Sequence, residues 1–122
     1  MKNFTIAAFT TLLLSSAAMA DCTAPALPEL PDGASSTMED MLAGQKAVKT
    51  FQASNIEYMK CLEPAIATAE AALKDADKDG KDAAQSSYGE LIDAYNSAVS
   101  NEEEVAGKFN SEIKAFKAAN PS

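Results

Sequence analysis

Apolar residues recur at spacings of three and four over a long stretch that begins at Ser36 and ends at Leu73. That spacing places them on one face of an α-helix, which turns once every ~3.6 residues. A capping signal opens the stretch, because Ser36 and Glu39 have the spacing of a capping box. We therefore predict a helix over this range. Its apolar stripe comprises Met41, Gly44, Val48, Phe51, Asn55, Tyr58, Leu62, Ala65, Ala69 and Leu73.

Pro64 interrupts the predicted helix. Its nitrogen carries no hydrogen to donate to the carbonyl of Lys60, and its ring crowds that carbonyl. We predict a kink between Cys61 and Pro64. One alternative stays open, in which residues 64–73 fold as a separate third helix.

A second apolar stripe follows a polar connection over residues 74–87, which contains no large apolar side chain. Ser87 and Glu90 have the spacing of a second capping box. We predict a second helix from Ser87 to about Ala119, ended by Asn120-Pro121. Its apolar stripe comprises Ile92, Tyr95, Val99, Glu102, Ala106, Phe109, Ile113 and Phe116.

The two stripes fit an antiparallel pair of helices with a turn near Gly80. Residues that face each other then have numbers that sum to about 160, so that Phe51 meets Phe109 and Tyr58 meets Glu102. We expect an all-α fold, an elongated antiparallel helical hairpin with coiled-coil packing over residues 36–120. Each helix has one neighbour and many alanines, so self-association into a four-helix bundle would cover the remaining apolar surface.

A proline-rich segment over residues 21–35 precedes the hairpin, with Pro25, Pro28 and Pro31 three apart. This period matches polyproline II, which predicts an extended strap with its prolines on one edge and Ala24, Leu27 and Leu30 on another. The strap would span about 43 Å if extended, and the helix from Ser36 to Cys61 about 38 Å. After a reversal at Asp32-Gly33, the strap can therefore run back beside the helix with its leucines against it.

The N-terminal segment of residues 1–20 has the pattern of a secretory signal. Lys2 precedes an apolar run too short to span a bilayer, and Ala18-Met19-Ala20 has the small residues of a cleavage site. We predict cleavage after Ala20 and a location in the periplasm. Asp21 stands where a lipoprotein needs a small residue, so we expect no stable membrane anchor.

Two cysteines in an exported chain are expected to pair, because the compartment is oxidising. The proline strap would bring Cys22 beside Cys61, as its length matches that of the helix. We predict a disulfide between them, with a free buried thiol at Cys61 as the alternative.

The net charge and the missing residue types limit which partners the chain can bind and which reactions it can catalyse. The chain has a net charge of −8 and contains neither histidine nor arginine; the charge becomes −9 if Lys2 leaves with the signal. Nucleic acid and anionic membrane are unfavourable partners for such a chain, because both bind basic patches. The commonest general base and the bidentate anion clamp are absent, so we predict no catalytic activity.

The sharpest motif lies in the polar connection. Asp75, Asp77 and Asp79 are followed by Gly80, the order found in the first half of an EF-hand calcium loop. The second half of the loop over residues 75–86 departs from the pattern, because Ser86 replaces the bidentate glutamate. Two interpretations stay open: a solvated turn, or a weak calcium site.

Several short motifs occur in a characteristic order: Leu30 to Gly33, Met38 to Met41, Tyr58 to Cys61, Tyr95-Asn96 and Phe109-Asn110. Together with Cys22, this order resembles small exported helical proteins of proteobacteria that have no assigned function. The resemblance covers most of the chain after residue 20. It implies an exported helical protein and supplies no catalytic or binding residue.

We therefore expect an exported envelope protein that acts by protein contact, as a structural, adaptor or chaperone-like component. Its partner is an unknown protein or a second copy of the chain. The alternative function is weak binding of a divalent cation, calcium, through the loop over residues 75–86.

Overall fold

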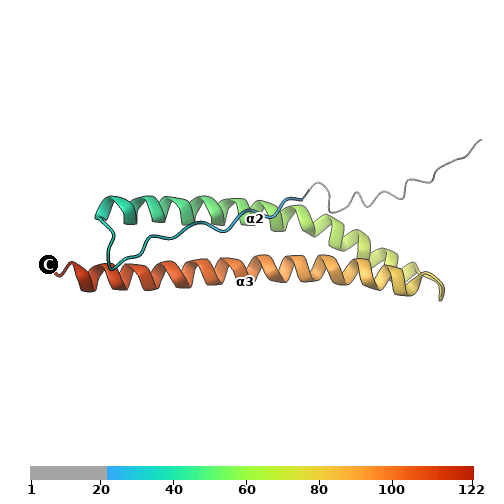
Figure 1. Cartoon of the computed structure of the whole chain (residues 1–122). Coiled ribbons are helices and arrows are strands. Elements are labelled where there is room, and N and C mark those ends of the chain that lie inside the picture. The colour runs from blue at the N-terminus through green and yellow to red at the C-terminus, as the bar shows by residue number, and fades with distance from the viewer. Residues whose placement is uncertain (1–21) are drawn as a thin grey trace, which may run out of the picture.

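A computed structural model describes residues 22–122; the predicted signal segment and its cleavage site lie outside these residues. Two long helices, α2 (Met38–Asp75) and α3 (Lys81–Ala119), lie side by side and antiparallel (Figure 1). The described residues contain no strand. The predicted all-α helical hairpin is therefore confirmed.

The first residues of α2 differ by one position from the prediction. Thr37 is the N-cap: its Oγ1 accepts from the amide of Asp40 at 3.1 Å, and the Asp40 carboxylate accepts from the amide of Thr37 at 2.9 Å. The prediction of Ser36 with Glu39 is wrong, because two overlapping pairs in this stretch satisfy the same capping rule. A turn closed by the Ser35 amide and the Asp32 carbonyl places Thr37, not Ser36, at the cap.

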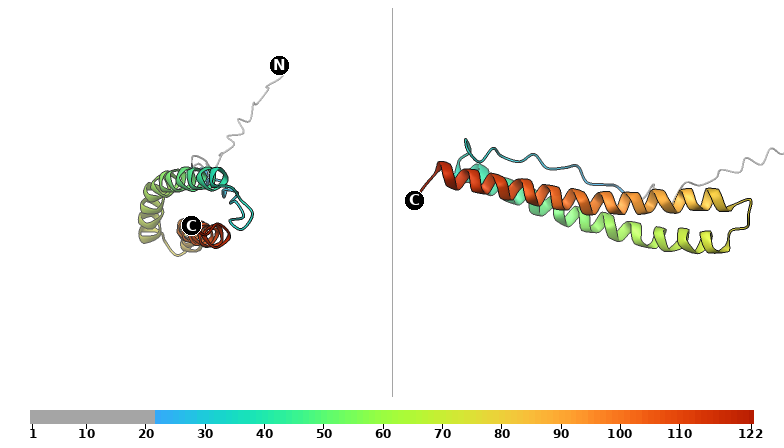
Figure 2. Two further views of the ribbon diagram at one scale, coloured as in Figure 1. Left: turned by 90° about the vertical axis from the view of Figure 1, so that its left-hand side faces the viewer. Right: turned by 90° about the horizontal axis from the view of Figure 1, so that it is seen from below.

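The helix α2 continues through Pro64 and ends at Asp75. Figure 1 shows its axis turning toward α3 in the light-green part, as the predicted kink requires. The alternative of a third helix over residues 64–73 is wrong. In the end-on view of Figure 2, α3 projects as a compact circle and α2 sweeps along an arc around it.

The helix α3 begins at Lys81, six residues before the predicted cap at Ser87. Residues 81–87 carry no large apolar side chain, but none of them breaks a helix, and an existing helix extends at little cost. The N-cap is Gly80, which has no side chain for capping. Its own amide instead donates to the carboxylate of Asp77 at 2.9 Å.

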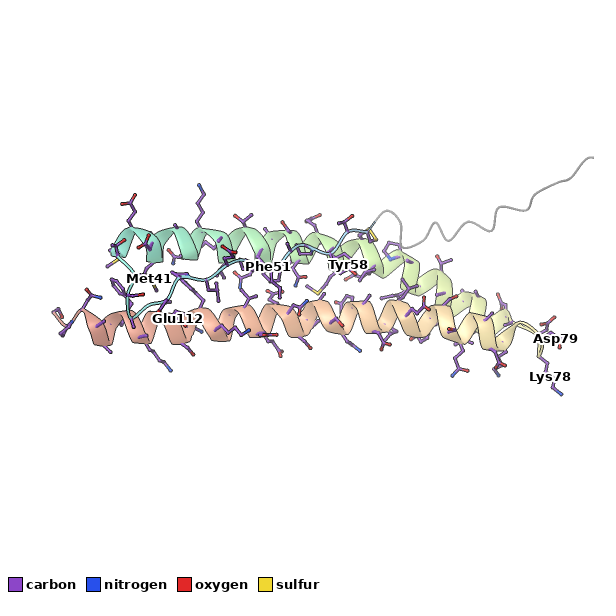
Figure 3. The ribbon with its side chains drawn as sticks, in the orientation of Figure 1. Met41, Phe51, Tyr58, Lys78, Asp79 and Glu112 are labelled. Carbon is purple, nitrogen blue, oxygen red and sulfur yellow. A yellow bond between two sulfur atoms is a disulfide. The ribbon has the colours of Figure 1, made fainter. Side chains whose placement is uncertain are left out.

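The earlier start of α3 changes which residues face each other. The turn between Asp75 and Lys81 centres on residue 78, so facing residues have numbers that sum to about 156 rather than 160. The buried stripe on α3 is also rotated about the helix axis relative to the prediction: Ala98 and Val105 are buried, whereas the predicted core residue Val99 is 39% exposed. Met41 and Phe51 lie between the helices (Figure 3), in a core cluster that also contains Val48, Val105 and Phe109.

The strap before α2 runs extended along one side of the hairpin, which is clearest in the view from below in Figure 2. Pro25, Pro28 and Pro31 are half-buried, whereas Leu27 is 53% exposed. Leu30 packs against the core cluster as predicted. The prediction for Leu27 is wrong, because at this level of the strap Pro25 and Pro28 lie beside α2 and Leu27 points to solvent.

Candidate interaction surface

A disulfide joins the start of the strap to the middle of α2. Cys22 and Cys61 are bonded with an S–S distance of 1.99 Å and a Cα–Cα distance of 5.6 Å. The predicted pairing is confirmed, and the described residues contain no free cysteine. A disulfide of this kind fits an oxidising compartment.

The other end of the strap is held by α3. The amide of Gly33 donates to the Glu112 carboxylate at 2.7 Å, although 79 positions separate the two residues. Gly33 is buried, and a Cβ placed on it would lie 1.8 Å from the backbone oxygen of Glu112. Only a residue without a side chain fits between the strap and α3, so this glycine fixes how closely the strap reversal can approach.

Between these two anchors the strap covers one side of α2. Pro25 and Pro28 line a shallow depression with Ala43, Ala47 and Thr50 of α2. Pro31 lies above Gly44, whose absent Cβ would stand 2.6 Å from the proline ring. Small residues on this side of α2 thus let the strap lie close to the helix.

Among the described residues 22–122, no segment covers the opposite side of the hairpin in this way. We call this surface the open face and define it by one row from each helix at seven-residue spacing, which stays on one side of a helix pair. The row on α2 consists of Leu42, Lys49, Ile56 and Glu63. The row on α3 consists of Ile92, Val99, Ala106 and Ile113.

Large apolar side chains of the open face are exposed to solvent. Leu42 is 57% exposed, Ile56 41% and Val99 39%. Met38, which lies one helical turn before Leu42, is 60% exposed. Each of these side chains would lose solvent contact favourably against an apolar partner.

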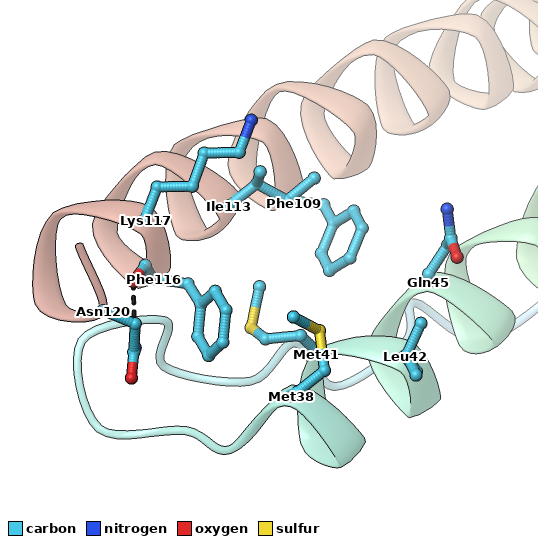
Figure 4. Close-up of a pocket in the computed structure, with 9 residues that line it drawn as sticks. All are labelled: Met38, Met41, Leu42, Gln45, Phe109, Ile113, Phe116, Lys117 and Asn120. Atoms are coloured by element: carbon cyan, nitrogen blue, oxygen red, sulfur yellow. Dashed lines mark hydrogen bonds between the residues drawn. The ribbon is translucent and has the colours of Figure 1, made fainter. Parts of the chain in front are cut away.

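An apolar groove of about 320 Å³ lies at the end of the open face that is far from the turn (Figure 4). Met38, Met41 and Leu42 approach it from α2, and Phe109, Ile113 and Phe116 from α3. Gln45, Lys117 and Asn120 supply its polar rim. The groove has the size of a few side chains and could receive an apolar residue of a partner.

One buried amide ties the two helices together beneath the open face. Asn55 is 1% exposed, and its Nδ2 donates to the carbonyl of Ala98 at 2.9 Å and to the Glu102 carboxylate at 3.3 Å. The sequence predicted Tyr58 as the partner of Glu102, which is wrong because the register differs by about one helical turn. A buried polar residue of this kind fixes the register of a helix pair, since any slip would leave it without partners.

The predicted calcium residues lie at the turn. The Asp77 carboxylate accepts from the Gly80 amide, and Asp79 points away from both helices beside Lys78 (Figure 3). Over residues 22–122, no three acidic, cysteine or histidine side chains lie together in a way that could hold a metal ion. Side-chain placement thus adds no support for Asp75, Asp77 and Asp79 as ligands, and the calcium site stays a prediction.

The sequence pointed to the disulfide but not to Glu112, Gly33 or the open face. Glu112 is one of many glutamates on helices, and nothing local marks it as the partner of a glycine far away in the chain. The available signal for the open face was the spacing of two heptads between Leu42 and Ile56, two residues that the predicted core stripe left out.

No family model matches the chain, and neither does any curated protein or any solved structure. The resemblance to small exported proteins of proteobacteria therefore stays a prediction. Neither helix of the described part is long and apolar enough to cross a membrane.

Proposed function

We propose that the chain is an exported protein of the periplasm that acts by protein contact through the open face. It serves as a structural, adaptor or chaperone-like component of the envelope and catalyses no reaction. The observation that carries this proposal is the exposure of Leu42, Ile56 and Val99 along one side of the hairpin.

The rest of the molecule supports a role in presenting that surface. The strap is anchored at both ends, by the disulfide and by the hydrogen bond from Gly33 to Glu112, and it covers the side of α2 that lies away from the open face. Because the strap holds one side of the hairpin in place, a partner that binds the open face causes little further loss of conformational freedom. The disulfide also fits the predicted export.

Site-specific photo-crosslinking in the native envelope tests the proposal. A photoreactive residue at Ile56 should give crosslinked protein, because this position lies in the middle of the open face. The matched control is Leu27, which is similarly exposed but lies on the strap. Absence of crosslinks from Ile56, or equal crosslinking from Leu27, would contradict a role for the open face.

The proposed export of the chain is tested by a separate measurement. Mass spectrometry of the chain recovered from the periplasm should find Asp21 as the first residue, and thiol alkylation without a reductant should label neither cysteine. A chain that keeps Met1 and reacts with the alkylating reagent would contradict the proposed location.

A further inference from the structure

We propose that the partner of the open face is a second copy of this chain, and that the two hairpins form a four-helix bundle around a two-fold axis parallel to the helices. This inference rests on the proposed function, because it names the occupant of the same surface. In the dimer, α2 of each copy packs against α3 of the other.

The distribution of charge favours a second copy. Within the two rows that define the open face, Lys49 and Glu63 are the ionised residues, and their charges cancel; Lys117 lies at the rim of the groove. The acidic net charge, −8 for the full chain and −9 once Lys2 leaves with the signal, is therefore carried outside these two rows. Two copies of an acidic protein repel each other, and contact through a neutral apolar face keeps that repulsion small. A basic partner would gain nothing from this face and would favour the acidic surfaces.

The two rows of the open face also complement each other. Asn55 reaches the carbonyl of Ala98, so the residues that follow them, Ile56 and Val99, lie at the same level along the hairpin. A two-fold axis parallel to the helices exchanges the sides of the hairpin but keeps the level. Ile56 therefore meets Val99 of the second copy, and by symmetry this apolar pair occurs twice.

The same two-fold rotation also brings the α2 row of one copy against the α3 row of the other at the groove. Leu42 and Ile113 both line the groove and therefore lie near the same level. Across the axis, each Leu42 meets Ile113 of the other copy, again twice. The dimer thus pairs apolar residues at two levels that are two heptads apart, which is the spacing that a helical bundle requires.

The lysine between these two apolar levels has an acidic partner. In the matched rows Lys49 lies opposite Ala106 of the second copy, one heptad from each apolar pair. Glu103 precedes Ala106 by about one helical turn, so the Lys49 ammonium can reach the Glu103 carboxylate of the second copy. The charge of Lys49 thus finds a partner at the rim of the interface.

Sedimentation equilibrium of the chain purified after export, over a wide range of concentration, tests the dimer. The wild-type chain should be a dimer, and the double variant I56E/V99E should associate at least about 30-fold more weakly. Both replaced side chains are exposed in the hairpin, so circular dichroism should show unchanged helix content. The control variant L27E should remain a dimer. A wild-type chain that stays monomeric, or an I56E/V99E variant that dimerises normally, would overturn the proposal.

Disulfide trapping tests the arrangement. When the single variants I56C and V99C are mixed, the proposed axis predicts a disulfide between the two different variants. A faster disulfide between two copies of I56C would instead place α2 against α2 and would overturn the proposed axis.

The crosslinking experiment separates this inference from the proposed function. Crosslinks from Ile56 to another copy of the chain support both. Crosslinks only to a different protein, together with a monomeric chain, overturn the homodimer and leave the proposed function standing. No crosslink at all contradicts both.

Discussion

Replacement of Gly33 by alanine should destabilise the chain, because the added Cβ has no room. It would lie 1.8 Å from the carbonyl oxygen of Glu112, 2.8 Å from its carbonyl carbon and 2.9 Å from the amide nitrogen of Phe116. Residues four apart share a hydrogen bond in an α-helix, so Gly33 lies directly on the backbone of α3. A helix backbone cannot move aside, and the strap reversal must lift away instead.

The expected loss of stability follows from the contacts that the strap reversal loses. Lifting it breaks the 2.7 Å hydrogen bond from the Gly33 amide to the Glu112 carboxylate, and a bond to a charged group contributes about 1.5–3 kcal/mol. Looser packing of the neighbouring Leu30 on the core adds to this. No glycine of the described residues has a positive φ, so backbone strain contributes nothing. We expect a loss of about 2–4 kcal/mol in the free energy of unfolding.

Gly107 provides a matched control. It lies in α3, and a Cβ placed on it would meet no atom within 4 Å. Gly107→Ala should therefore stabilise the chain by about 0.5–1 kcal/mol, through the helix propensity of alanine. Both variants add one methyl group and restrict the unfolded chain in the same way, so their difference reports the contact of Gly33 with α3.

Urea unfolding followed by circular dichroism gives both values. For a domain of this size, the loss for Gly33→Ala corresponds to a fall of roughly 10–20 °C in Tm. A double-mutant cycle with Glu112→Ala should show that the two changes are not additive, because they remove one interaction. Stability of Gly33→Ala within about 0.5 kcal/mol of the wild-type value would refute the reasoning.

Four further results are expected. Replacement of Cys22 and Cys61 by serine should lower the free energy of unfolding by about 4 kcal/mol, the chain-entropy value for a 39-residue loop, and unfolding with and without reductant provides the check. Asn55→Ala should cost about 1–3 kcal/mol, because its buried acceptors on α3 lose a donor; urea unfolding measures this, and a neutral result would contradict it. Hydrogen bonds from the backbone amide and the hydroxyl of Thr37 lower the pKa of Asp40. The Asp40 carboxylate therefore stabilises the folded chain at pH values above its pKa in the unfolded chain, which is ~3.9. This stabilisation is lost as the pH falls through the lower pKa of Asp40 in the folded chain. Acid titration of helix content should show this loss in the wild-type chain but not in Asp40→Asn. If the loop over residues 75–86 binds calcium, calorimetry of the calcium-free chain should show heat at millimolar calcium. This heat should disappear when Asp75, Asp77 and Asp79 are replaced by asparagine, and the absence of heat from the wild-type chain would end the hypothesis.

The sequence predicted local features well where one physical rule decided them. The three-and-four spacing gave two helices, and the prolines three apart gave an extended strap whose length matched the distance to Cys61. It predicted less well where two rules competed. The caps at Thr37 and Gly80 were missed because a second capping pair stood nearby and because helix extension over residues 81–87 needs no apolar residue.

The sequence by itself determined the two amphipathic helices, the stiffness of the strap and the pairing of the cysteines, because periodicity, backbone restriction and cysteine count are properties of short segments or of the whole composition. Only the tertiary structure decided the register, the burial of Gly33 against Glu112 and the side of the hairpin that the strap leaves open. These features depend on where the turn places one helix against the other. In the observed packing α3 is rotated about its axis so that Ala98, rather than Val99, faces α2, and this places Val99 on the open face.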